Sequence, residues 1–291
     1  MNGLKTAALL GLMSALLLAG GELLGGRNGL MMGLLVAVGM NFFSYFFSER
    51  LSLAMYSAAP VTPEQNTDVF ARVFPLVHNL TQRMGLPMPK LWLIPDASPN
   101  AFATGRDPHH ASVAFTEGIL HTMNDRELEG VVAHELGHVL HRDILISSVA
   151  ATMASAITFL ARMAFFFGGS RDEEEERGGA LGGLLMLILA PIAAMLIQMA
   201  ISRTREFSAD EASAKYTGSP DGLIHALRKL ERGVAQVPMD ATPATAHLFI
   251  VNPFSNGGFT RMFSTHPSTE ERIARLEALR GAPVPVLSAA H

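Results

Sequence analysis

The chain has 291 residues, 49% of them apolar, and a mean hydropathy of +0.27, which is high for a soluble protein. A formal net charge of −4 offers no basic surface for nucleic acid, so we expect no nucleic-acid partner. The absence of cysteine excludes disulfides, thiolate metal sites and a cysteine nucleophile. These values fit a chain of which a large part lies in a membrane.

Four apolar stretches are almost free of charge, and Glu22 and Arg162 are the only charges within them. They are residues 6–26, 30–48, 144–167 and 181–201. Each is about as long as a helix that crosses the ~30 Å hydrocarbon core of a bilayer. We therefore predict two transmembrane hairpins, one in residues 1–50 and one in residues 144–201. A cleaved secretory signal is the alternative for the first stretch, because Lys5 precedes it.

The polar residues form two blocks, 51–143 and 202–291, which the second hairpin separates. In the first block the pattern predicts an amphipathic helix that is capped near Thr62 and closed by Gly85. Three short strands follow, within KLWLIPD, NAFATG and SVAFTEGIL, because turn residues separate these apolar runs. Residues 125–142 are helical by pattern.

The second block is predicted to be helical as well. We expect one helix that ends at Gly218, a second over residues 221–233, and a last one capped by Ser268 or Thr269. The acidic run at residues 172–176 lies between the third and fourth apolar stretches and is interpreted as a solvated loop tip. The fold class expected from these elements is mainly α with a small β-sheet.

The sequence HELGH at residues 134–138 predicts a metal site. On a helix, His134 and His138 lie on one face about 6 Å apart, so both rings can bind one ion. Glu135 points near the same space, where its carboxylate can take a proton from a water molecule that the ion activates. His141 lies about 10 Å along the axis from His134, which is too far for all three rings to share one ion.

A hydrolytic zinc site needs three protein ligands and one open position, and Glu206 is the predicted third ligand. Asp210 follows one turn later, where it can orient a ligating histidine. The alternative is that both carboxylates are solvated and pair with Arg203 or Arg205. The second hairpin favours the first interpretation, because the helices before and after a hairpin emerge on the same side of the membrane.

The same topology places the ion near the bilayer. His138 precedes the third apolar stretch by six residues and Glu206 follows the fourth by five, so the ion lies within about 10 Å of the hydrocarbon boundary. Substrates that are held at the membrane are therefore expected. More basic residues flank the spans on the side of the site than on the other side, which favours a cytoplasmic site.

Four motifs follow one another in the chain: PNAFATG, HELGH, SRTREFSAD and STHPSTEERIARLEAL. With these motifs the chain resembles, over nearly its whole length, the bacterial HtpX membrane zinc peptidases, which are relatives of the CaaX prenyl-protein endopeptidases. The resemblance implies that His134, His138 and Glu206 bind one Zn²⁺ ion per chain. It also implies that Glu135 is the general base.

Further expectations follow from the resemblance alone. Asn100 and His266 match positions that help to bind the substrate backbone or the developing oxyanion. The implied fold is a gluzincin-like zinc protease domain on a base of four membrane spans, in the bacterial inner membrane with its site facing the cytoplasm. The implied role is proteolysis of misfolded or damaged membrane proteins under stress, so the expected partners are polypeptide substrates and the lipid bilayer.

Two other functions remain open at this point. Two histidines and one carboxylate also form the ligand set of non-haem iron redox enzymes, although such a set does not need Glu135 beside it. An inactive membrane scaffold or chaperone that binds unfolded proteins through the same groove is the second alternative. The complete set of ligands and base favours the peptidase over both.

Overall fold

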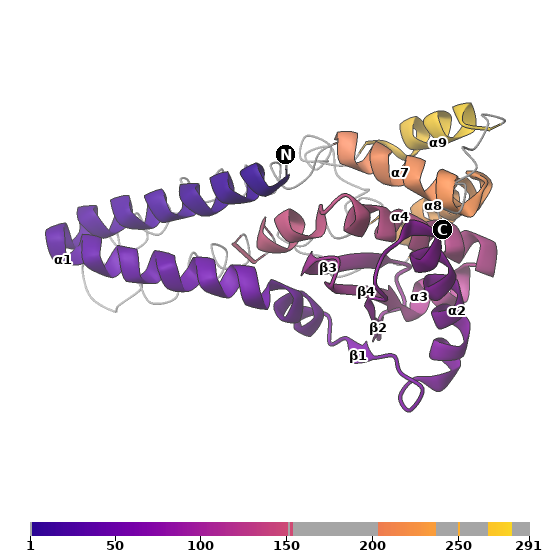
Figure 1. Ribbon diagram of the computed structural model, residues 1–291, viewed down its shortest axis with the longest axis horizontal. Helices are drawn as coiled ribbons and strands as arrows, with labels where there is room; N and C mark the ends of the chain where they lie inside the picture. Colours follow the sequence, from indigo (N-terminus) through magenta and orange to yellow (C-terminus); the bar gives the residue numbers. More distant parts are fainter. Residues whose placement is uncertain (1, 151, 154–202, 237–249, 251–266, 281–291) are drawn as a thin grey trace.

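The computed structural model describes residues 2–150, 152–153, 203–236, 250 and 267–280. Most of the predicted second hairpin, the acidic run at 172–176 and His266 lie outside these residues. The described part is mainly helical with one small mixed sheet, as the sequence predicted. Figure 1 shows a long helical hairpin at one end and a group of shorter helices around the sheet at the other.

The helix α1 (Asn2–Met55) is one continuous helical run that turns back on itself at Gly26, where φ is +55°. Figure 1 shows its two arms side by side and antiparallel. The arms meet at glycines, because a side chain on Gly21 would collide with the backbone of Gly29. Residues 2–55 thus form a helical hairpin in the structure, and its second arm extends beyond the predicted end at residue 48.

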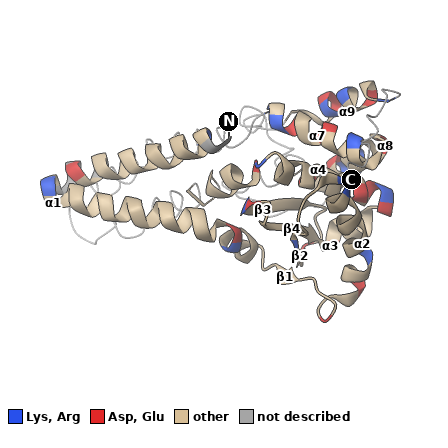
Figure 2. Ribbon diagram, viewed as in Figure 1, with Lys and Arg blue, Asp and Glu red and all other residues tan. Residues whose placement is uncertain are grey.

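The outward faces of α1 are apolar. Among the described residues, Gly26–Met55 is the one helix long and apolar enough to cross a membrane, and only 17% of its most apolar window is buried. The other arm contains a shorter apolar helix, Leu4–Ala19. Figure 2 shows both arms almost without charge between their ends. The sequence predicted two spans here, and the structure gives one helix of spanning length beside a shorter one.

A four-stranded sheet begins the polar part of the molecule. Its strands are β1 (Ala59–Pro60), β2 (Lys90–Ile94), β3 (Ala101–Asp107) and β4 (His110–Thr116). They lie in the order β1-β2-β4-β3, with β2 and β4 parallel and the other pairs antiparallel. The three predicted strands are confirmed, except that the end of the third becomes the short helix α3 (Glu117–Thr122), which Thr116 caps.

The helix α2 (Thr67–Met84) starts later than predicted. The hydroxyl of Thr62 accepts the N–H groups of the residues two and three positions later and so caps a turn, not the helix. The helix itself begins after Asn66, whose left-handed φ of +58° turns the chain into it. Its end at Gly85, with φ of +66°, is as predicted.

The helix α4 (Asp125–Leu140) carries the HELGH sequence. Asn124 and Glu127 form a capping box at its start, in which each side chain accepts the other's backbone N–H. The helix ends two residues before the predicted end, because Arg142 takes a left-handed φ of +58°. A new helical segment starts at residue 144, directly after Asp143.

Three helices form the described part of the second block: α7 (Arg203–Thr217), α8 (Asp221–Gln236) and α9 (Thr269–Ala278). As predicted, α7 ends at Gly218 and Ser268 caps α9, whereas α8 continues past its predicted end at Gly233. One hydrophobic core joins both blocks, since it includes Phe115 from the first and Leu227 from the second.

Candidate metal centre

The helices α4 and α7 cross closely because the residues between them are small. A side chain on Gly137 would lie 3.1 Å from Cα of Ala209 and 3.2 Å from Cβ of Ala212. Nearby, Ser213 Oγ donates a hydrogen bond of 2.7 Å to the carbonyl oxygen of Gly130. This contact brings the first turns of α7 against the face of α4 that carries HELGH.

His134, His138 and Glu206 meet at this crossing, with one ligand atom of each within 4.8 Å of the other two. Nε2 of His134 is 3.7 Å from one carboxylate oxygen of Glu206, and Nε2 of His138 is 3.6 Å from the other. Two ligands that are each about 2.1 Å from a tetrahedral ion lie about 3.4 Å apart. The three side chains therefore fit a zinc-sized divalent ion.

The second nitrogen of each imidazole faces a carboxylate. Nδ1 of His134 lies 2.9 Å from Oδ1 of Asp210, and Nδ1 of His138 lies 3.4 Å from Oδ2 of Asp143. Such a carboxylate keeps the ring proton on Nδ1 and leaves Nε2 free for a metal. Glu206 and Asp210 are only 6% and 3% exposed, so the alternative of two solvated charges is wrong.

The carboxylates around His138 favour its charged form. Burial alone would lower the pKa of His138, but the hydrogen bond with Asp143 and the charges of Glu206 and Glu135 outweigh burial and raise the pKa to about 9. A group of carboxylates that stabilises a proton on an imidazole also stabilises a metal cation in its place. A cation that binds here must displace that proton.

Arg272, from α9, completes the buried cluster. Its guanidinium donates hydrogen bonds of 2.9 and 2.6 Å to the two oxygens of Asp210 and one of 2.8 Å to the carbonyl oxygen of Ile250. Burial alone would raise the pKa of Asp210, but Arg272 outweighs it and holds that pKa below its ordinary value. Asp210 therefore stays ionised and can accept the ring N–H of His134.

Glu135 lies beside the three ligands and is 5% exposed. Its Oε2 accepts a hydrogen bond of 2.8 Å from the backbone N–H of Ala103 in β3. Burial raises the pKa of Glu135 above its ordinary value, although His134 and His138 partly oppose the rise. A carboxylate with a raised pKa next to a metal site is suited to accept and release a proton.

The other predicted site residues have different positions. Asn100 is 2% exposed and its side-chain oxygen accepts the backbone N–H of Ile250 at 3.3 Å, so its predicted contact with substrate stays a prediction. His266 lies outside the described residues. His141 caps the end of α4, is exposed, and is not part of the group formed by the three ligands.

Sequence reasoning missed Arg272 and Asp143. Arg272 lies within the last recognised motif, but its sequence position gives no sign that it reaches Asp210 on another helix. Asp143 follows His138 by five residues, outside the spacing of a regular helix face, and reaches the ring because α4 ends at Leu140. The aspartate just before the apolar stretch was the available signal.

Known proteins resemble this chain over most of its length. Residues 67–280 match the model of peptidase family M48. The chain is 52% identical over 290 residues to a "Protease HtpX homolog" of Desulfatibacillum aliphaticivorans, which covers 97% of this chain and 92% of the relative. A relative of the same description from Ralstonia nicotianae is 53% identical over 278 residues, covering 94% of this chain and 96% of the relative.

Among solved structures, S. mikatae Ste24p has 19% sequence identity and a TM-score of 0.49, and the match covers 92% of this chain and 62% of that one. The family match and the relatives that are about half identical extend over most of this sequence. The chain is therefore a membrane metalloendopeptidase and belongs to peptidase family M48.

Proposed function

We propose that the chain cuts peptide bonds of membrane proteins with one zinc ion held by His134, His138 and Glu206. The observation that carries this proposal is the convergence of two imidazole nitrogens and a carboxylate, from two helices, at separations that suit a tetrahedral ion. Three protein ligands leave one position open, as catalytic zinc sites require. The bound ion supplies Lewis-acid chemistry, because it polarises a carbonyl and makes water more acidic.

Glu135 is the general base in this proposal. The N–H of Ala103 fixes one oxygen of its carboxylate, and the other oxygen is available for a proton from the attacking water. The raised pKa of Glu135, which burial causes, makes the carboxyl group able to hold that proton and then pass it to the leaving amine. Asp210 and Asp143 keep the two histidines in the tautomer that presents Nε2 to the ion.

The substrate is proposed to lie extended beside β3, which is an edge strand of the sheet. Pairing with an edge strand uses backbone groups, so it accepts many sequences. The N–H of Ala103 already serves Glu135, so the pairing would use the other backbone groups of residues 100–104. Asn100 and His266 are proposed to bind the substrate backbone or the oxyanion, as the family resemblance implies.

The membrane architecture is part of the proposal. Residues 1–50 and 144–201 form two transmembrane hairpins, and residues 51–143 and 202–291 form the two parts of one gluzincin-like catalytic domain. The shared core of the two blocks and the apolar surface of α1 support this division. His138 lies six residues before the helical segment that starts at residue 144, so the site is close to the bilayer.

This position suits substrates that are themselves held in the membrane. We therefore extend the proposal to a site that faces the cytoplasm of a bacterial inner membrane and removes misfolded or damaged membrane proteins. The relatives described as HtpX homologues support this role. Purified protein that cut soluble casein as readily as a membrane-embedded substrate, in the same detergent, would contradict the membrane bias.

One experiment tests the chemistry. Protein produced without added metal is analysed for zinc and iron, and the wild type and Glu135→Gln are assayed for peptide cleavage. We expect zinc in both proteins and a loss of about 100- to 10,000-fold in cleavage for the variant, the usual contribution of a general base. Glu129→Gln is the matched control on the same helix, and it should remain active because Glu129 is not near the ligands.

The other outcomes separate the alternatives. Iron with oxygen-dependent turnover would favour a redox enzyme. Bound zinc without cleavage in the wild type would favour an inactive scaffold. Full activity of Glu135→Gln would remove Glu135 as the base while leaving the metal site in place.

A further inference from the structure

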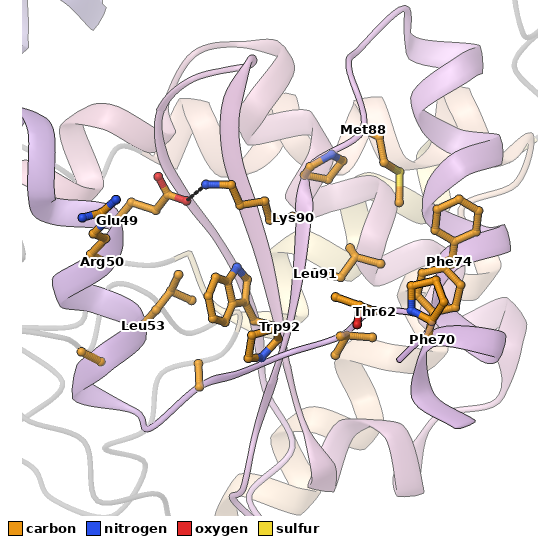
Figure 3. Close-up of a pocket in the computed structure, with 16 residues that line it drawn as sticks. Glu49, Arg50, Leu53, Thr62, Phe70, Phe74, Met88, Lys90, Leu91 and Trp92 are labelled. Atoms are coloured by element: carbon orange, nitrogen blue, oxygen red, sulfur yellow. Dashed lines mark ion pairs between the residues drawn. The ribbon is translucent and has the colours of Figure 1, made fainter. Parts of the chain in front are cut away.

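A cavity lies at the edge of the sheet that is opposite to β3. It has a volume of about 740 Å³ and is lined by the last turns of α1, the strands β1 and β2, and α2. That volume is within the range of about 300–1,000 Å³ that is usual for sites of small ligands. The side chains labelled in Figure 3 come from α1, α2 and β2 and from the segments that precede α2 and β2. None of the predicted catalytic residues lines it.

Most of the cavity wall is apolar. Leu53 of α1 and Trp92 of β2 lie on one face of the sheet, and Leu91 lies on the other face with Phe70 and Phe74 of α2 (Figure 3). The rings of Phe70 and Phe74 are stacked, with their centroids 4.7 Å apart. The apolar wall is suited to a hydrocarbon chain, which needs shape and burial but no hydrogen bonds.

One end of the cavity is charged. Glu49, Arg50 and Lys90 lie together at this end, as Figure 3 shows. Glu49 is already engaged, because its carboxylate accepts a hydrogen bond of 2.7 Å from Ser112 and lies 3.5 Å from Lys90. Trp92 donates to the same serine at 3.0 Å, which fixes its ring in the wall.

The two cations at this end outnumber the carboxylate. Arg50 has no carboxylate partner among the described residues, and its guanidinium lies over the ring of Phe47 at 5.9 Å. The side chain of Lys90 is 68% exposed, so it can turn to a ligand while Glu49 remains bonded to Ser112. This end of the cavity therefore carries a net positive charge beside an apolar wall.

The position of the cavity indicates where its ligand comes from. The wall that contains Arg50 and Leu53 is the end of Gly26–Met55, the helix long and apolar enough to cross a membrane. Residues at the end of such a helix lie at the level of the lipid headgroups. Basic residues at this level attract the phosphates of anionic lipids.

We infer that this cavity binds one anionic phospholipid of the surrounding bilayer, with its phosphate between Arg50 and Lys90 and one acyl chain along Leu53 and Trp92, which lie on the same face of the sheet as Lys90. The inference rests on the proposed membrane hairpin but not on the peptidase chemistry. An anionic lipid satisfies both ends of the cavity, whereas a free phosphate leaves the apolar wall uncovered. The bound lipid would hold the catalytic domain against the membrane at the end of α1.

The chain contains its own reporter for this site, because Trp92 is the single tryptophan of the sequence. Bromine atoms on an acyl chain quench tryptophan fluorescence on contact. Purified full-length protein is placed in phosphatidylcholine vesicles that contain increasing fractions of brominated phosphatidylglycerol or, separately, brominated phosphatidylcholine. We expect half-maximal quenching at a mole fraction at least about five-fold lower for the anionic lipid.

The double variant Arg50→Gln/Lys90→Gln should lose this preference, so that both brominated lipids quench alike. Arg126→Gln/Lys215→Gln removes the same charge from exposed positions outside the cavity and should keep the preference. Retained peptide cleavage in both variants shows that they are folded. Inorganic phosphate at matched ionic strength should not relieve the quenching.

Equal quenching by the two lipids in the wild type would overturn the site, as would an unchanged preference in Arg50→Gln/Lys90→Gln. Displacement of the lipid by inorganic phosphate alone, or by an apolar peptide regardless of lipid charge, would also overturn it. Absence of quenching by either lipid would overturn the site too, because Trp92 lines the cavity. A failure of the peptidase proposal is separate, since it is measured by cleavage and metal content.

Discussion

The helices α1 and α4 both contain large apolar side chains, but many of these side chains are exposed in α1, whereas most are buried in α4. In α1, Phe42 and Phe43 are 58% and 46% exposed, whereas in α4 Leu128 and Leu136 are fully buried. A soluble protein does not leave a long row of large apolar side chains in water. The exposed fraction of the apolar side chains, more than their number, therefore distinguishes a membrane helix from a helix in a protein core.

Polar groups show the same contrast. The buried polar groups of α4 include its proposed functional ones, His134 and Glu135, and each of these two has a partner from another element. In α1 the hydroxyl of Ser44 is buried and has no hydrogen-bond partner within the part of the chain that the structure describes. Changes in the α4 region should therefore affect chemistry and metal binding, and changes in α1 should affect membrane packing. The variants below test this separation.

The largest effect is expected for Glu206→Ala, which removes one of the three proposed ligands. Changes in residues that only support ligands cost about 10- to 100-fold in metal affinity or activity, so loss of a ligand should exceed about 100-fold. We expect zinc to be lost on dialysis and cleavage to fall with it, while the protein stays in the membrane fraction. Metal content after dialysis is the measurement.

Glu211→Ala, at an exposed position of α7, is the control for Glu206→Ala and should keep its zinc. Unchanged zinc content in Glu206→Ala would remove Glu206 from the site. Loss of the protein from the membrane fraction would break the separation between the two regions.

The next effect concerns Arg272→Met. The carboxylate of Asp210 would remain buried without the guanidinium that now donates two hydrogen bonds to it. Removing one partner of a buried ion pair costs about 3–5 kcal/mol. We expect a loss of stability of about 3 kcal/mol, measured as the free energy of unfolding of the catalytic domain in detergent.

Adding Asp210→Asn to Arg272→Met should recover part of this loss, because no unpaired charge is then buried. Arg232→Met, an exposed change on α8, should be close to neutral. If Arg272→Met is no less stable than Arg232→Met, Arg272 does not hold the cluster together.

The residues of the metal centre differ in how far the sequence alone could predict them. His134, Glu135 and His138 were predictable because a helix repeats every 3.6 residues, and Glu206 because a hairpin returns the chain to the same side. Arg272 was not, since it lies 138 residues from the histidine that it approaches, and only the packing of α9 brings it there. The role of Asp143 depends on where α4 ends.

The fold was predictable to a similar degree. Strands separated by turn residues and helices closed by Gly85 and Gly218 were found where expected, because these glycines take the left-handed backbone that ends a helix. The cap at Thr62 was wrong because the hydroxyl serves a local turn instead. Gly233 does not end α8 as predicted. A glycine stands there because the position lies against Pro99 and has no room for a side chain.

A smaller effect is expected for Gly29→Leu in α1. A side chain there would collide with the backbone of Gly21 in the opposite arm. Overpacking of this kind costs about 1–3 kcal/mol, so we expect a lower melting temperature of the hairpin in detergent. Gly39→Leu is the matched control, because nothing lies within 4 Å of the added atom. Equal melting of the two variants would contradict the close contact between the arms.

The smallest effect concerns the pH dependence of metal binding. Burial lowers the pKa of His138, but Asp143 and the nearby carboxylates outweigh burial and raise the pKa to about 9. Below that pH the proton competes with the metal, so apparent zinc affinity should rise about ten-fold per pH unit and level off near pH 9. Competition with a zinc-binding dye measures this between about pH 6 and about pH 10, a range that includes both the ordinary and the raised pKa of histidine.

Asp143→Asn sharpens this prediction because it separates two roles of the carboxylate. Without the charge of Asp143, the pKa of His138 should fall, so the plateau should begin at a lower pH. The plateau affinity itself should drop about ten-fold, because the ring loses the partner that orients it. Asp107→Asn, in the β3–β4 turn, should change neither quantity. If Asp143→Asn lowers the affinity without moving the plateau, the carboxylate orients His138 but does not set its charge.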